Sequence, residues 1–460
     1  MKWSMRRFTR HTVAIGIALG LSGCAVTRDD WPAEDFRNPL ERPKKPPVVQ
    51  ASFQAPTPVV REPGFGQELR VDAVVQAVLA RNPSLDEMRA AATAAAARYP
   101  QVTSLDDPTF AFTTAPGSIG SRNVDYAARA EISQKLPFPG KRDLKGQVSM
   151  AEASAAARDL DDTRLMLIAA AKSAVADYYL AERGTAVAQE NAKLLLEFRQ
   201  NAESRYKTGQ APQQDLLQAE VEVARQEERL VALRRARQVA IARLNTLMHL
   251  PPDASLPPPA EIRESSSIPD APVLRASASA RPDLRAAVDR LAADEATLAL
   301  ALAEYKPDVD LMAAYDGFWQ GEGGRPLQWQ VGARVNLPVR YSRRSGAVSE
   351  AQSRVAQRRA VLAKLTDRVN FEVQEAWEQV RETDEIVSLY ESKILPAAEA
   401  NVKEAQAGYV AGRVPFLNLV EAQRNRVGLK DRYFEAVSEA LRRRAALERA
   451  VGQPLPAAAR

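Results

Sequence analysis

The chain carries two kinds of hydrophobic pattern, short alternating stretches and long stretches with helical spacing. Strict alternation of apolar and polar residues predicts strands with one apolar and one polar face, over the ranges 108–114, 126–136, 308–315 and 327–337. Apolar residues spaced by three or four predict helices over 70–98, about 142–207, 213–248, 280–305, about 342–408 and 415–451. At ~1.5 Å per residue the longest helices would reach roughly 100 Å, which predicts rods rather than a compact globule.

The pattern inside the long stretches favours pairing between helices. In 213–248 two series of apolar residues recur at sevens, interrupted by Gln226 and Arg237. In the second long stretch the apolar side steps by three or four through Leu362, Leu365, Val369, Val373, Ala376, Val380, Thr383 and Val387. Many of these positions are small, which allows close approach between helices.

The order of these elements occurs twice, which indicates an internal duplication. The segment Tyr206–Ala219 matches Tyr409–Ala422 at an offset of 203 residues, and Leu136-Pro137 matches Leu337-Pro338 at an offset of 201. We therefore predict two repeats, 67–250 and 281–455, joined by a proline-rich linker at 251–280.

The N-terminus has the features of an export signal. Four basic residues in 1–11 precede an apolar stretch, 12–21, that is too short to span a bilayer. Leu21-Ser22-Gly23-Cys24 resembles the bacterial lipobox, so we expect 1–23 to be removed and Cys24 to carry lipid. An ordinary signal peptide with an incidental cysteine is the alternative. The proline-rich range 24–66 is predicted to be an extended tether.

Composition excludes several classes of function. One cysteine and two histidines exclude a disulfide framework and most zinc, haem and iron–sulfur sites, so we expect no metal and no cofactor apart from the lipid on Cys24. Removal of 1–23 takes away four basic residues and no acid, which lowers the net charge from +5 to +1. Such a balance does not indicate a nucleic-acid partner. We find no catalytic motif and expect no enzyme.

The alternating stretches have the length and two-faced character of strands in a membrane barrel. Four strands cannot close a barrel, for which about eight are the practical minimum. Unpaired strand edges in lipid would cost several kcal/mol per unsatisfied group. The chain is therefore expected to share a barrel among identical copies, and three copies supply twelve strands.

Taken together, the lipobox, the duplication, the strand-pair and long-helix order and the Tyr-x-x-Gly-x-x-Pro turns resemble the TolC-type outer-membrane efflux channel family. The resemblance covers residues 67–455. It implies a mainly helical fold with a small transmembrane β part. Duplicated helical hairpins would form a trimeric α-barrel tunnel, which joins a shared twelve-stranded β-barrel in the outer membrane. It also implies a large periplasmic portion, with a periplasmic adaptor and an inner-membrane pump as partners.

The same resemblance points to function at the two hairpin turns. The family docks its adaptor at such tips, and the matching residues are Tyr206, Gly209, Pro212, Tyr409, Gly412, Arg413 and Pro415. Simple turn chemistry explains the glycines and prolines equally well. The family commonly places an acidic ring at its aperture, and those positions fall on Asn418 and Glu421, with Asp215 available from the other tip. Three copies of such a carboxylate would attract cations, although a solvated helix face is the simpler alternative for each residue.

Several functions remain open at this stage. The segment 134–142 is similar to the strand-to-helix junction of the heavy-metal cation efflux branch. The same fold also serves multidrug efflux and type I secretion. A periplasmic adaptor lipoprotein would share the lipobox and a long hairpin, but adaptors carry one hairpin and more β structure than this chain.

Overall fold

The computed structural model describes residues 64–118, 128–262, 268–317 and 328–455. The chain divides into two units, Met1–Val59 and Val60–Arg460. The first unit lies wholly outside the described residues, as do the predicted signal peptide and Cys24.

The four predicted strands form one antiparallel sheet in the order β1-β2-β3-β4. They are β1 Thr109–Thr114, β2 Ala128–Leu136, β3 Val309–Gly317 and β4 Trp329–Val335. Each lies within about two residues of the range predicted from alternation. The central pair, β2 and β3, joins the two repeats, and β1 and β4 are the edges.

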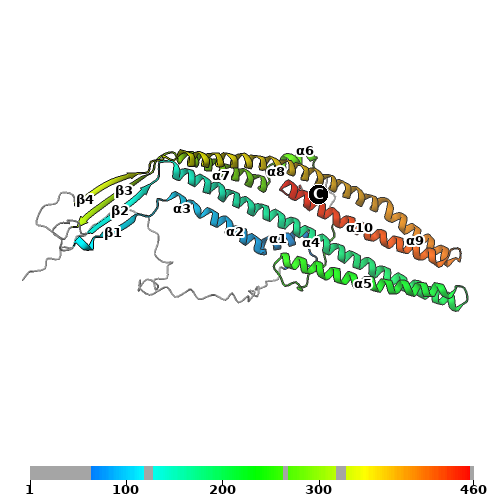
Figure 1. Ribbon diagram of the computed structural model, residues 1–460. Helices are drawn as coiled ribbons and strands as arrows, with labels where there is room; N and C mark the ends of the chain where they lie inside the picture. Colours follow the sequence, from blue (N-terminus) through cyan, green and yellow to red (C-terminus); the bar gives the residue numbers. More distant parts are fainter. Residues whose placement is uncertain (1–63, 119–127, 263–267, 318–327, 456–460) are drawn as a thin grey trace, which may run out of the picture. The chain divides into compact units, whose positions relative to one another are not determined.

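The predicted helical hairpins are also present in both repeats. The helices are α1 Val71–Arg81, α2 Pro83–Ala96, α3 Arg98–Thr103, α4 Lys141–Lys207, α5 Gln213–Leu247, α6 Ala271–Ala278, α7 Pro282–Ala303, α8 Tyr341–Leu389, α9 Leu395–Val410 and α10 Phe416–Val451. The long helices run from the sheet to two hairpin tips (Figure 1). The predicted mainly helical, duplicated fold is confirmed. Among the described helices, none combines the length and the apolar character needed to cross a membrane.

Two predicted helices are interrupted, for local reasons. The stretch 70–98 breaks at Asn82, whose side chain accepts a hydrogen bond from Ser84 N–H at 3.0 Å and caps the helix that Pro83 begins. The second long stretch breaks at a π-helical turn, Tyr390–Ile394, that precedes Pro396. A proline lacks the N–H that a continuous helix requires, and the wider turn accommodates this loss. In addition, the short helix α6 lies within the range predicted as linker.

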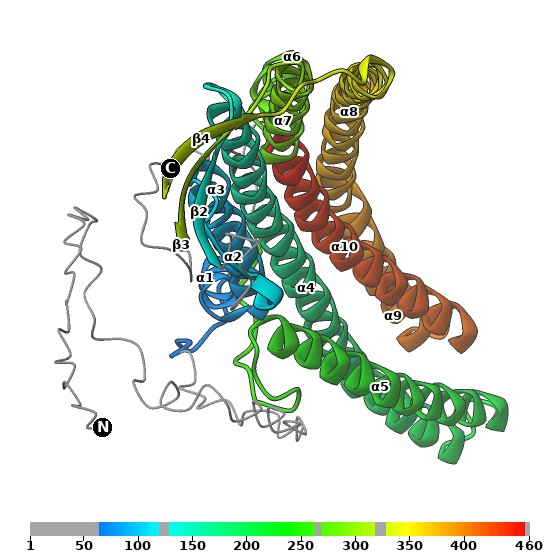
Figure 2. The ribbon, with the colours of Figure 1, turned by 60° about the vertical axis from the view of Figure 1, so that its left-hand side comes forward.

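The helices lie side by side in a single layer. Near the sheet the order is α2, α4, α7 and α8, and toward the tips it is α5, α4, α10 and then α8 with α9. Helix α4 lies between α5 and α10 (Figure 2). Each end of this layer is therefore an open edge, formed by β1, α2 and α5 on one side and by β4, α8 and α9 on the other.

Three hydrophobic clusters hold the layer together. The first packs α1 and α2 onto α4 and α5, and the second packs α6 and α8 against the end of α10. Val369, Val373, Ala376, Val380 and Thr383 are buried, which confirms the predicted apolar side of this helix. The third, here called the tip cluster, consists of Leu195, Phe198, Ala219, Tyr409, Phe416, Leu419 and Val420.

Candidate functional site

Both tips fold as the same turn. Gly209 and Gly412 have φ angles of 74° and 72°, which favour glycine. Their N–H groups each donate to the carbonyl of the tyrosine three residues earlier, Tyr206 or Tyr409, at 3.0 Å. Pro212 and Pro415 then precede the first residues of α5 and α10. The repeated motif is thus sufficient to explain the backbone of both turns.

The two tyrosines nevertheless have opposite surroundings. Tyr206 is 42% exposed, whereas Tyr409 is 6% exposed and lies in the tip cluster. The ring of Tyr409 packs against Phe416 with centroids 5.3 Å apart. Arg205 of the first tip lies over that ring at 4.7 Å and donates to the Tyr409 carbonyl at 2.6 Å. The remaining predicted docking residues, namely Gly209, Pro212, Gly412, Arg413 and Pro415, are exposed.

The predicted aperture residues occupy two different environments. Asn418 and Glu421 are exposed near the start of α10. Asp215 is half-buried in the first turn of α5, where burial raises the pKa of its carboxyl and the charge of Arg205 partly offsets that rise. Burial raises the pKa of the Tyr409 hydroxyl, which has no hydrogen-bond partner among the described residues, and the negative charge of Asp215 adds to that rise. The fold therefore brings Asp215 and Tyr409, but not Glu421, to one place.

Above the tip cluster, buried polar contacts join α4, α5 and α10. Asn191 donates to Gln226 at 2.9 Å and accepts from Gln423 at 2.8 Å. Glu222 is 6% exposed and accepts two hydrogen bonds from Arg424, which raise the pKa of that guanidinium. The sequence pattern did not predict this group. Its only signal was Gln226, a polar residue at a heptad position that we described as an interruption.

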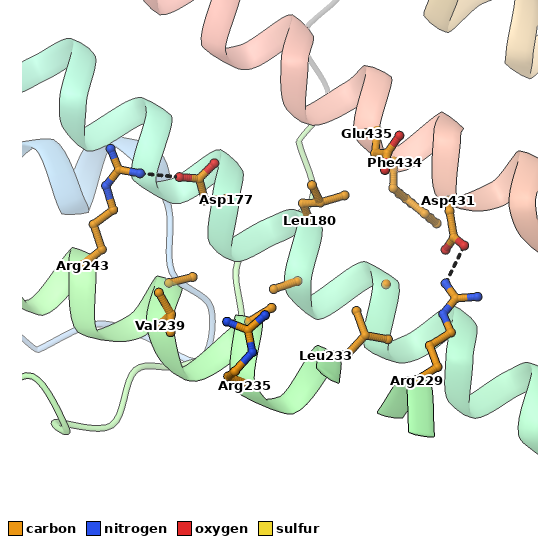
Figure 3. A pocket seen from close by; sticks show the side chains of 14 residues that line it. Asp177, Leu180, Arg229, Leu233, Arg235, Val239, Arg243, Asp431, Phe434 and Glu435 are labelled. Carbon is orange, nitrogen blue, oxygen red and sulfur yellow. Dashed lines mark hydrogen bonds and ion pairs between the residues drawn. The ribbon is translucent and has the colours of Figure 1, made fainter. Parts of the chain in front are cut away.

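A cavity of about 490 Å³ lies farther from the tips, between α5 and α10 (Figure 3). Leu180 of α4 and Leu233 and Val239 of α5 contribute apolar side chains to its wall. Two ion pairs border it: Arg229 pairs with Asp431, and Arg243 with Asp177 at 2.9 Å. The pair of Arg229 and Asp431 thus links α5 to α10 beside the cavity, and the pair of Arg243 and Asp177 links α5 to α4.

At the other end of the molecule, the sheet separates charge from apolar surface. One face carries Phe110, Phe112, Trp329 and Val331, with exposed fractions from 64% to 89%. The opposite face carries charged contacts, in which Arg129 pairs with Glu131 at 3.3 Å and Arg334 pairs with Asp310 at 3.5 Å. An exposed apolar face and a charged reverse face suit a strand sheet between lipid and water.

The sheet is fixed to the helices by a buried lysine at the junction that follows β2. Lys141 Nζ donates to Asp308 Oδ1 at 2.9 Å and to the Lys306 carbonyl at 3.0 Å. Asp308 also accepts from Phe138 N–H at 2.9 Å. Burial alone would raise the pKa of Asp308, but the hydrogen bonds from Lys141 and Phe138 outweigh it and lower that pKa. This contact ties the first repeat to the start of the second.

Comparison with known proteins agrees with this geometry. Residues 74–248 match the family described as outer membrane efflux protein. No curated protein matches the chain significantly. Among solved structures, the fold is similar to the outer-membrane channel OprN at 22% identity, covering 83% of this chain and 89% of that one with a TM-score of 0.71. It is also similar to VceC from Vibrio cholerae at 19% identity, covering 84% and 96% with a TM-score of 0.71.

A third similar solved structure is that of CusC, a protein whose conformation changes as it folds and forms a transmembrane channel. It is 17% identical and covers 83% of this chain and 92% of that one, with a TM-score of 0.70. At these identities the three structures bear on the fold alone. The matched segment 74–248, the duplicated hairpins and the two-faced sheet together make this chain similar to the outer membrane efflux protein family.

Proposed function

We propose that three copies of this chain form the outer-membrane channel of a tripartite efflux system. The observation that carries this proposal is the open sheet, in which β1 and β4 have no strand beyond them among the described residues. An exposed apolar face with unpaired edges is unstable in water and in lipid alike, because backbone groups in lipid must be paired. Three copies supply twelve strands, which is enough to close a barrel around a water-filled lumen.

The helices support the same assembly. The open edge of α5 exposes Leu217, Val221 and Val231, and that of α8 and α9 exposes Val361, Ile386, Leu389 and Val410. The residues on α5 recur at spacings that place them on one side of the helix. Contact between the α5 edge of one copy and the α8 and α9 edge of the next would bury both rows. The ring closed in this way would continue the barrel as a helical tunnel.

The tips are proposed to form the periplasmic aperture and the surface that receives an adaptor bound to an inner-membrane pump. We assign the exposed tip residues Tyr206, Gly209, Pro212, Gly412, Arg413 and Pro415 to docking. Tyr409 instead packs the tip internally, because its side chain is buried. Glu421 is assigned to the aperture, with Asn418 beside it. Asp215 is half-buried within the other tip.

Conductance of the reconstituted protein tests the aperture. Three copies of Glu421 in a narrow pore would attract cations, so Glu421→Ala is expected to reduce cation selectivity. Glu435→Ala is the matched control, because Glu435 is an exposed glutamate farther along the same helix. Equal selectivity of the wild-type protein and Glu421→Ala would contradict the assignment of Glu421.

Lipid on Cys24 is proposed to anchor the chain in addition to its barrel, after removal of 1–23. The range 24–66 would then serve as a tether, leading to the repeats 67–250 and 281–455 on either side of the linker 251–280. A periplasmic adaptor lipoprotein remains the alternative function, and extraction separates the two. A barrel protein carrying Cys24→Ser should still require detergent, whereas an adaptor held by lipid alone should become soluble.

We propose a passive conduit with no catalytic activity. The junction 134–142, which is similar to that of the heavy-metal cation efflux branch, favours heavy-metal cations as cargo, and drug efflux and type I secretion are the alternatives. Among the described residues, no group of three or more histidine, cysteine or acidic side chains could hold a metal ion. Measuring which toxic compounds accumulate in cells that lack the chain would identify the cargo.

A further inference from the structure

We infer the register in which neighbouring copies pair. Strand β4 of one copy lies antiparallel to β1 of the next, with Val335 opposite Phe110 and Ala333 opposite Phe112. This inference rests on the proposed shared barrel and adds the alignment of the strands at the contact between copies.

The internal duplication determines the register, because the two hairpins of the sheet match each other residue for residue. In the first hairpin Thr109 lies opposite Ser133, and in the second Asp310 lies opposite Arg334. Both residues of the second pair lie 201 positions after those of the first. All the other β1–β2 pairs with a described counterpart obey the same offset, for example Phe110 with Ile132 and Leu311 with Ala333. The two hairpins are therefore equivalent copies of one unit.

The contact between these two units is visible inside the chain, where β2 pairs with β3. Ile132 lies opposite Ala313, and Gln134 lies opposite Leu311. In a closed ring the second hairpin of one copy meets the first hairpin of the next through the equivalent contact. The equivalents of Ile132 and Ala313 are Ala333 and Phe112, separated in each case by 201 positions. The equivalents of Gln134 and Leu311 are Val335 and Phe110.

The two faces of the sheet provide an independent check. Phe110 lies opposite Ile132, Ile132 opposite Ala313 and Ala313 opposite Val331, so these residues share the apolar face. The inferred register continues this face across the boundary, because Ala333 and Val335 meet Phe112 and Phe110. A shift by one residue would place apolar side chains against the charged face. Only shifts by two residues keep the faces matched.

Charge complementarity extends the contact beyond the strands. Asp308 is bound within the chain by Lys141, the first residue of α4. The repeat counterpart of Asp308, 201 positions earlier, is Asp107, which is exposed and forms no ion pair within the described residues. Helix α8 begins with Tyr341, and Arg340 and Arg343 beside it are exposed. The inferred register brings Asp107, just before β1 of one copy, close to the basic start of α8 in the next copy.

Disulfide formation between engineered cysteines tests the register. The matched pairs are Phe112→Cys with Ala333→Cys and Phe110→Cys with Val335→Cys. Opposite residues in an antiparallel pair have Cα atoms about 4.5–5.5 Å apart, within the reach of a disulfide. The shifted pairs Phe110→Cys with Ala333→Cys and Phe112→Cys with Val335→Cys use the same four substitutions. Their diagonal separation of about 7–8 Å exceeds that reach.

The experiment uses the full chain in membranes under mild oxidation, followed by non-reducing gel electrophoresis. The matched pairs are expected to give covalent trimers, with at least about tenfold less product from the shifted pairs, because only opposite residues reach each other. Within one chain β1 and β4 are three strand spacings apart, about 14 Å, so the product must join different copies. Wild type and the single variants control for Cys24.

The mass of the assembly under reducing conditions separates the possible failures. Efficient linkage of a shifted pair, or of no pair in a protein of trimeric mass, would overturn the register and leave the proposed channel intact. A single-chain mass with no linkage would contradict the proposed channel itself.

Discussion

The contact between the two repeats of one chain, here called the inner seam, differs sharply from the two open edges, which we call the outer seam. At the inner seam β2 pairs with β3, and the Lys141 side chain is 3% exposed and bonded to Asp308. At the outer seam β1 and β4 pair with no further strand among the described residues, and Asp107 and Arg343 are exposed. Equivalent elements form both seams. The outer seam is therefore unpaired because only one copy of the chain is present, and its strands and helices are able to form the same contacts as those of the inner seam.

The same contrast is present at the tips. Tyr409 and Phe416 belong to the inner seam, where they pack against Leu195 and Phe198 of α4 in the tip cluster. Their repeat counterparts, Tyr206 and Gln213, lie 203 positions earlier and are exposed. A single chain therefore completes one seam along its whole length and leaves the other incomplete.

The largest effect is expected from breaking the inner seam at its buried ion pair. Lys141→Met leaves the Asp308 carboxylate, whose side chain is 15% exposed, without its cation. Breaking such a pair typically costs about 3–5 kcal/mol, because the remaining charge is buried and uncompensated. Thermal unfolding of the detergent-solubilised protein measures the loss. Lys141→Met combined with Asp308→Asn should recover part of it, and equal stability of wild type and Lys141→Met would contradict the role of the pair.

A somewhat smaller loss is expected at the other end of the inner seam. Phe416 is 2% exposed in the tip cluster, so Phe416→Ala removes a buried ring and should cost about 3 kcal/mol. Gln213→Ala, at the repeat counterpart, should change stability by less than about 0.5 kcal/mol, because that side chain is exposed. Limited proteolysis at the tips can measure both changes. Equal sensitivity of the two variants would remove the distinction between the seams at this level.

The apolar face of the sheet tests the membrane environment of the barrel. Val331→Arg places a charge on that face and should destabilise the protein folded in lipid vesicles by about 2–3 kcal/mol. Val288→Arg on α7, where the valine is 50% exposed, should have little effect. If both variants were equally stable in vesicles, the apolar face would not be in contact with lipid.

The smallest effect is expected from the charge at the outer seam. Asp107→Asn should lower the equilibrium constant for trimer association by a factor of about two to five, because exposed ion pairs contribute little. The difference should shrink in high salt, where screening weakens such pairs. Asp106→Asn is the control, since the neighbouring carboxylate has no bound counterpart at the inner seam. Sedimentation at several salt concentrations would measure both variants.

The sequence predicts the regular elements well and the exceptions poorly. Alternation located all four strands because successive side chains of a strand point to opposite faces of the sheet. The interruption at Asn82 and the π-helical turn at Tyr390 escaped detection, because a single cap or a single proline barely changes the apolar pattern. The tip motif predicts the same backbone in both repeats, but not the opposite burial of Tyr206 and Tyr409. That difference depends on which helices lie beside each tip.

The mass of the protein extracted in mild detergent tests the central claim most directly. Multi-angle light scattering on the size-exclusion peak, corrected for bound detergent, should give three times the mass of one mature chain. Circular dichroism of the same peak should show strand signal beside the dominant helical signal. A peak with the mass of one chain that retains its sheet would contradict the account, because a single copy would then tolerate both of its open edges.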